Sequence, residues 1–166
     1  SDNWTYGAEK LNELKIDFIN IHIYAIDIFP ADPRDNVFQR ACSAADSAHA
    51  AGKQICLGET WLYKQAQTDT DDPEVIYGRD YFDFWQPLDQ KYLSLMLKLA
   101  HYKQFVFISP FWSTFFFSYL TYDEAKDLST AERKSKNNQQ AAASVYKNIY
   151  SETGTAYRTM IKNGPQ

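Results

Sequence analysis

The sequence predicts an α/β protein in which parallel strands alternate with helices. Three segments rich in Ile, Val and aromatic residues have the length of single strands: residues 16–26, 54–58 and 105–109. Segments with apolar residues at helical spacing separate them. Strands that alternate with helices are joined by right-handed crossovers and lie parallel in one sheet.

The first half of the chain predicts two such units. Residues 7–15 have apolar side chains at helical spacing and predict a helix. In residues 16–26, Ile alternates with Asn, His and Tyr, which is typical of a strand. After a loop with two prolines, the Ala-rich residues 37–51 predict a helix that stops at Gly52, and residues 54–58 form the second strand.

The second half predicts a long acidic and aromatic loop over residues 65–86, followed by a helix over residues 87–103. After the third strand, residues 110–130 predict an aromatic loop with a short helix. Residues 131–150 predict the last long helix, and residues 154–164 predict a helical turn.

Two architectures fit this order of elements: a small open doubly wound sheet, or a portion of a (β/α)8 barrel. The strands are nearly continuous in apolar residues, which predicts that both faces of the sheet are covered. With 166 residues, the chain (1–166) suits a single domain or a fragment of a larger one. In either architecture, functional groups lie at the carboxyl ends of the strands.

The amino-acid composition indicates which kinds of ligand or partner the chain favours. A net charge of −4 does not favour nucleic acid or an anionic membrane surface, and the longest apolar runs are too short to span a bilayer. The aromatic fraction is 16%, enough to line a cleft that stacks on sugar rings. Cys42 and Cys56 predict buried thiols rather than a disulfide, and no motif predicts a metal site or a cofactor. The cellular location stays open, with a secreted or extracytoplasmic one favoured.

Chemically useful residues follow each predicted strand. His22 and Tyr24 share one face of the first strand, Glu59 follows the second, and Trp112 follows the third. Parallel neighbours would present an imidazole, a phenol, a carboxylate and an indole along one rim. Each has a plainer reading: a helix cap or surface ion pair for Glu59, a core histidine for His22, and core filling for Trp112.

These strand ends resemble the last three strands of clan A retaining glycoside hydrolases, the (β/α)8 enzymes that include family-five cellulases. The matching motifs are "HIYA", "GETW" and "FWS", and the resemblance covers residues 16–115. It implies the C-terminal portion of a TIM barrel that hydrolyses the glycosidic bonds of a poly- or oligosaccharide. It also implies that Glu59 is the nucleophile, that Tyr24 hydrogen-bonds it, and that His22 contacts a sugar hydroxyl or a catalytic group.

The resemblance also implies where the sugar binds. Trp112 would stack under the ring at the scission point, while Trp61 and Tyr63 would extend the cleft; Trp61 has packing as its alternative. Asp27, in the loop after Tyr24, is the best internal candidate for a second acid.

The family's acid/base Glu and first five strands have no match in this sequence. The expected partner is therefore the missing N-terminal half of the barrel, from the same or another chain, and we expect little or no glycosidase activity from this chain in isolation. Two other functions stay open. One is a non-catalytic carbohydrate-binding module, and the other is a flavodoxin-like domain, for which residues 25–35 offer no phosphate-binding loop.

Overall fold

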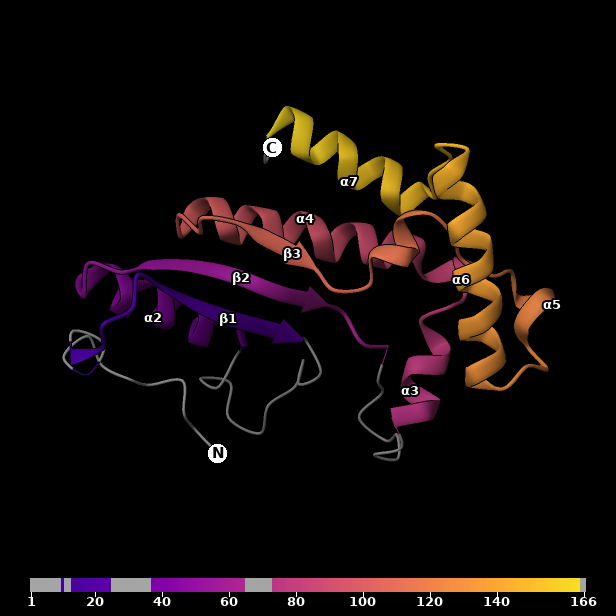
Figure 1. Cartoon of the computed structure of the whole chain (residues 1–166), viewed down its shortest axis with the longest axis horizontal. Helices are drawn as coiled ribbons and strands as arrows, with labels where there is room; N and C mark the ends of the chain where they lie inside the picture. The colour runs from indigo at the N-terminus through magenta and orange to yellow at the C-terminus, as the bar shows by residue number, and fades with distance from the viewer. Residues whose placement is uncertain (1–9, 11–12, 25–36, 65–72, 165–166) are drawn as a thin grey trace. The chain divides into compact units, whose positions relative to one another are not determined.

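The computed structural model confirms an α/β fold in which a three-stranded, parallel, open sheet alternates with helices (Figure 1). The structure describes residues 10, 13–24, 37–64 and 73–164. Its contacts divide the chain into two compact units. The first unit comprises Ser1–Thr60 and Met96–Phe111, and the second comprises Trp61–Leu95 and Trp112–Gln166.

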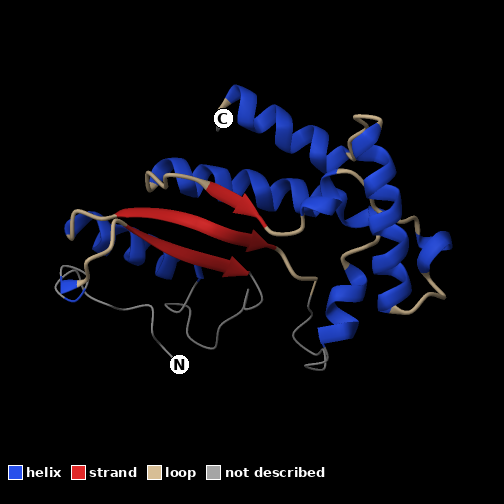
Figure 2. Cartoon of the chain, viewed as in Figure 1, coloured by secondary structure: helices blue, strands red, loops and turns tan. Residues whose placement is uncertain are grey.

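The sheet has the strand order β1-β2-β3, with all three arrows pointing the same way (Figure 2). The strands are β1 (Phe18–Tyr24), β2 (Gln54–Trp61) and β3 (Ile108–Pro110). Leu57 pairs with Ile108 and Thr60 with Pro110, and the register shifts between these two pairs. Such an irregularity re-aims the side chains next to it, and Glu59 is one of them.

The helix α2 (Val37–Ala50) connects β1 to β2 and packs against β1. It ends as predicted at Gly52, whose φ of 64° suits a glycine after a helix. The Ile21 and Ile23 side chains of β1 are buried, while Phe18 and His22 on the alternate face are exposed. Among the residues that the structure describes, this second face of β1 is therefore not covered as the sequence predicted.

The predicted helix over residues 87–103 is α4 (Gln86–Tyr102). Its residues up to Leu95 belong to the second unit, where Leu93 is fully buried. Its residues from Met96 onwards belong to the first unit, where Met96 is fully buried. One continuous helix thus supplies core side chains to both units.

The second unit is mainly helical. Its remaining elements are α3 (Pro73–Arg79), η1 (Asp83–Trp85), η2 (Ser113–Phe116), α5 (Tyr122–Ala125), α6 (Thr130–Tyr146) and α7 (Glu152–Asn163). The prediction of a loop up to residue 86 is wrong for residues 73–79, which are helical. The final segment is a full helix of 12 residues rather than a turn.

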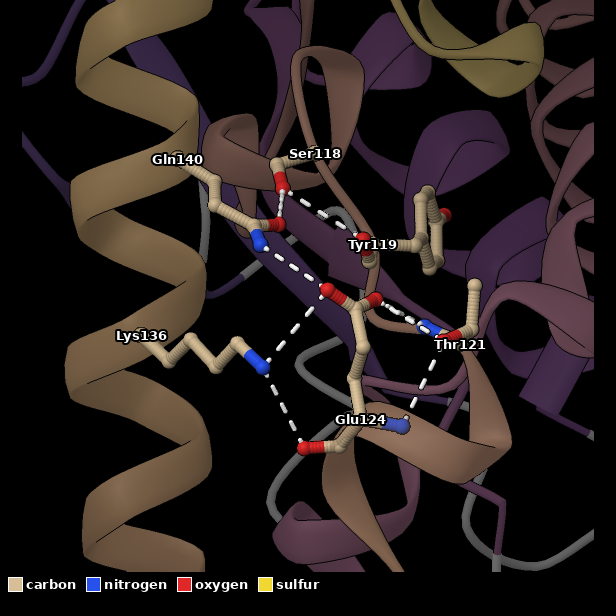
Figure 3. Close-up of polar contacts among 6 residues, drawn as sticks. All are labelled: Ser118, Tyr119, Thr121, Glu124, Lys136 and Gln140. Carbon is tan, nitrogen blue, oxygen red and sulfur yellow. Dashed lines mark hydrogen bonds and ion pairs between the residues drawn. The ribbon is translucent and has the colours of Figure 1, made fainter.

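Two helices of the second unit begin with reciprocal capping. At α5, Thr121 and Glu124 form a capping box, and Ser129 and Glu132 do the same at α6. Figure 3 shows how Glu124 also reaches α6, where Lys136 Nζ lies 3.5 Å from its carboxylate. These donors, the Thr121 backbone N–H first among them, lower the pKa of Glu124. The cap therefore also ties α5 to α6.

Candidate functional site

The structure brings Glu59, His22 and Tyr24 together in the first unit. His22 and Tyr24 lie two residues apart near the end of β1, so their side chains share a face. Glu59 lies near the end of β2, the neighbouring strand. The parallel pairing of these two strands therefore produces the cluster that the sequence predicted.

Both β1 side chains contact the same carboxylate oxygen. The Tyr24 hydroxyl donates a short hydrogen bond to Glu59 Oε2. His22 Nδ1 lies 3.3 Å from that oxygen. Because both contacts reach Oε2, they fix the orientation of the Glu59 carboxylate plane.

The cluster is half-exposed, with 45% of the His22 side chain and 35% of the Glu59 side chain accessible. A buried salt bridge would lose hydration on both partners, whereas these groups keep part of theirs. The arrangement can therefore admit a polar ligand to the carboxylate without first breaking a buried core.

Phe111 supports the tyrosine and was not identified from the sequence as a site residue. Its ring packs edge-on against Tyr24, with 5.7 Å between ring centroids and an interplanar angle of 83°. The Phe111 backbone N–H donates to Thr60 O at 3.0 Å, which joins the end of β3 to β2. The signal in the sequence is the aromatic residue that directly precedes Trp112 in "PFWS".

Trp61, Trp112 and Tyr63 lie in the second unit. Trp61 is 1% exposed and its ring stacks on Phe115, 5.6 Å between centroids, which is the packing role weighed for it. Tyr63 is also buried. Trp112 is half-buried and packs at 6.3 Å from Tyr77. Their assignment to a sugar cleft stays a prediction.

Asp27, the candidate second acid, lies outside the described residues. Within the described part of the chain, no group of three or more His, Cys, Asp or Glu side chains is arranged to hold a metal ion. The helices there include none with the length and hydropathy to cross a membrane. Cys42 and Cys56 are free thiols, and Cys56 is buried.

A second cluster of ionisable side chains, missed from the sequence, lies inside the second unit. Lys64 Nζ is 2.5 Å from Asp89 Oδ1 and 3.1 Å from Asp80 Oδ1, and all three side chains are at most 2% accessible. Lys64 also donates to Leu62 O at 3.0 Å. The hydroxyl of Tyr119 donates to Asp89 Oδ2 at 2.9 Å.

The two aspartates of this cluster differ in how well they are satisfied. Asp89 accepts hydrogen bonds from both Lys64 and Tyr119, whereas the Asp80 oxygens, although near Lys64, have no well-directed hydrogen bond. Burial raises the pKa of Asp80 to about 7, against the opposing effect of Lys64. Burial also raises the pKa of Asp89. The cluster thus holds more negative than positive charge and favours an added proton on Asp80.

The chain was compared with protein-family models, with curated proteins and with solved structures, and nothing matched in any of the three comparisons.

Proposed function

We propose that this chain supplies the nucleophile strand of a retaining glycoside hydrolase, with Glu59 as the nucleophile. The observation that carries the proposal is the pair of contacts that Tyr24 and His22 make with Glu59 Oε2 at the ends of adjacent parallel strands. The resemblance of the three strand ends to clan A enzymes supports the same role. In this proposal the three strands are the C-terminal portion of a (β/α)8 barrel.

The geometry suits a carboxylate that attacks carbon. Tyr24 and His22 both contact Oε2, so Oε1 is the oxygen assigned to the anomeric carbon of the sugar. Attack by Oε1 forms a covalent glycosyl–enzyme ester while the glycosidic bond to the leaving oxygen breaks. Water then cleaves the ester, and the sugar leaves with its original anomeric configuration.

A retaining mechanism needs a second carboxyl group about 5–5.5 Å from the first, which protonates the leaving oxygen. We assign this role to a group outside the described residues. Asp27 is the candidate within this chain, and the missing N-terminal half of the barrel is the alternative source. Trp112 would stack beneath the sugar ring of the poly- or oligosaccharide, whereas Trp61 and Tyr63 are buried side chains of the second unit.

Covalent trapping tests the nucleophile directly. The full-length gene product that contains this chain would be incubated with activated 2-deoxy-2-fluoro glycosides of several sugars, and the adduct located by peptide mass spectrometry. We expect the label on Glu59 and its loss in Glu59→Gln. Hydrolysis with inversion, or a label on another carboxylate, would overturn the proposal.

The same reagents separate catalysis from binding alone. We expect the isolated chain to hydrolyse aryl glycosides little or not at all, since it requires the second carboxyl group. If the full-length protein also fails to hydrolyse them, oligosaccharide binding that survives Glu59→Ala but not Trp112→Ala would replace our proposal with a carbohydrate-binding module.

A further inference from the structure

Asn20 lies two residues before His22 on the same face of β1, and its amide contacts two other side chains. Its Nδ2 is 3.3 Å from His22 Nε2. Its Oδ1 is 3.5 Å from Cys56 Sγ, on the neighbouring strand β2. Asn20 therefore sits between a buried thiol and the imidazole that reaches Glu59.

We propose that Asn20 is a positioning residue that fixes the tautomer of His22, so that a neutral imidazole presents Nδ1–H to Glu59. The order of donors is the Cys56 thiol to Asn20 Oδ1, Asn20 Nδ2–H to His22 Nε2, and His22 Nδ1–H to Glu59 Oε2. Its relevance to catalysis rests on the proposed role of Glu59, but the tautomer itself does not.

The amide orientation follows from Cys56. Burial raises the pKa of this thiol, which is 1% exposed, and therefore keeps it protonated as a donor. Cys56 Sγ also lies 3.5 Å from Ile19 O, so its proton has two acceptors within reach. A reversed amide would point its N–H at sulfur, which is a weak acceptor, and would forgo the imidazole nitrogen.

The imidazole orientation follows from both of its neighbours. An amide N–H directed at Nε2 requires a lone pair there, and a neutral imidazole with a lone pair on Nε2 carries its proton on Nδ1. That proton then points at Glu59 Oε2, 3.3 Å away. The opposite tautomer would place two pairs of like groups face to face: N–H against N–H at Asn20, and lone pair against lone pair at Glu59.

Gly58 makes this arrangement possible. A Cβ atom at position 58 would lie 2.2 Å from Asn20 Oδ1 and 2.4 Å from Nδ2, far inside contact distance. The obstructed group is the end of a side chain, so an alanine there would displace the amide and leave the backbone in place. The absence of a Cβ atom at position 58 thus leaves room for the Asn20 amide in the position it occupies.

Nitrogen NMR of the isolated chain tests the tautomer without any need for activity. The chain has three histidines, so the His22 signals are assigned by their loss in His22→Gln. Spectra would be recorded at about pH 8.5, well above the ordinary histidine pKa of about 6.5. We expect Nε2 to resonate as an unprotonated nitrogen and Nδ1 as a protonated one.

Three substitutions then break the donor order at different points. Asn20→Asp replaces the N–H by an acceptor and should shift His22 to Nε2–H, or to the doubly protonated form. Gly58→Ala should give a mixture of tautomers, because it displaces an amide that is itself unchanged. Cys56→Ala should weaken the preference, and Cys56→Ser, which keeps a donor, should restore it.

The proposal is overturned if wild-type His22 is protonated on Nε2, or if Asn20→Asp and Gly58→Ala leave its nitrogen shifts unchanged. In the full-length protein, the same two variants should lower kcat about tenfold, as losses of orienting contacts around a reactive group commonly do. A tautomer that responds as expected in a protein without hydrolytic activity would refute the proposed function and leave the role of Asn20 standing.

Discussion

Each of the two units holds a cluster in which hydrogen-bond donors contact carboxylate oxygens. The two clusters differ in how far their side chains are buried. In the first unit, Glu59 is contacted by uncharged or weakly basic donors and remains 35% accessible. In the second, Lys64, Asp80 and Asp89 are withdrawn from water almost completely. Similar chemical groups therefore differ in their access to water in the two units.

The degree of burial decides whether the side chains of each cluster are accessible to a ligand. Asp80 and Asp89 cannot be reached by a ligand in this structure, and their contacts join α4 to the chain segments that follow β2 and α3. A charge in such a site must be compensated within the fold. Glu59 keeps part of its contact with water, so its charge meets no such requirement.

The largest expected effect follows from removing the buried cation. Lys64→Met keeps much of the side-chain volume but leaves Asp80 and Asp89 without a positive charge between them. Breaking a buried pair in this way costs about 3–5 kcal/mol, which would be measured as the free energy of unfolding in urea at neutral pH.

A surface ion pair provides the matched control. Lys103 Nζ lies 2.8 Å from Asp46 Oδ1, and the Asp46 side chain is 64% accessible. Lys103→Met should therefore cost at most about 1 kcal/mol. Equal losses in the two variants would show that the Lys64 cluster is not a structural centre of the second unit.

A second effect of the buried cluster, of comparable size, should appear as pH dependence. Asp80 has a folded-state pKa of about 7, above the ordinary value near 3.9 expected in the unfolded chain. Between about pH 4 and about pH 7 the folded state therefore binds the extra proton, and its stability falls as the pH rises. A shift of about three pKa units corresponds to a loss of about 4 kcal/mol across this window, and Asp89 shares the titration.

The Asp80→Asn variant isolates this contribution. Asparagine mimics the protonated acid, so the difference in unfolding free energy between variant and wild type should grow as the pH rises to about 7 and then level off. Urea titrations at several pH values across the window would measure it. A difference that stays constant with pH would assign the dependence to other groups.

The sequence predicted the alternation of elements well because local patterns carry it. The end of α2 at Gly52 and the start of α4 near Pro87 depend on residues within one turn of each boundary. Helix α3, which was not predicted, contacts α6, which lies far away in the sequence. Thr130 Oγ1 donates to Glu74 O at 2.7 Å, and Arg133 Nη1 donates to Gly78 O at 3.1 Å.

Helix α7 was underestimated for a related reason. Gly154 lowers local helix propensity, but it lies so close to η2 that a Cβ atom there would be 2.0 Å from Phe116 O. The glycine is a packing requirement between distant segments, and such contacts leave no periodic signal in the sequence.

The candidate site was predictable only where strand order decides proximity. His22, Tyr24 and Glu59 lie at the ends of strands that pair in parallel, so their meeting follows from topology. The Lys64 cluster joins residues from four separate segments, up to Tyr119, whose approach depends on the packing of helices and loops. No spacing in the sequence predicts that approach.

The smallest effect on stability should come from Glu59 itself. Glu59→Gln removes the charge but keeps an oxygen that can accept from Tyr24, on a side chain that is partly hydrated. We expect the unfolding free energy to change by no more than about 0.5 kcal/mol in either direction. The measurement is the same urea titration at neutral pH, run beside the wild-type chain.

Asp89→Asn is the matched acid-to-amide control, since it removes a charge whose two hydrogen bonds are buried. This change should cost about 2–3 kcal/mol. If Glu59→Gln destabilised the chain as much as Asp89→Asn, Glu59 would be a structural residue like the buried aspartates. A near-zero or stabilising change would show that the fold does not depend on the Glu59 charge.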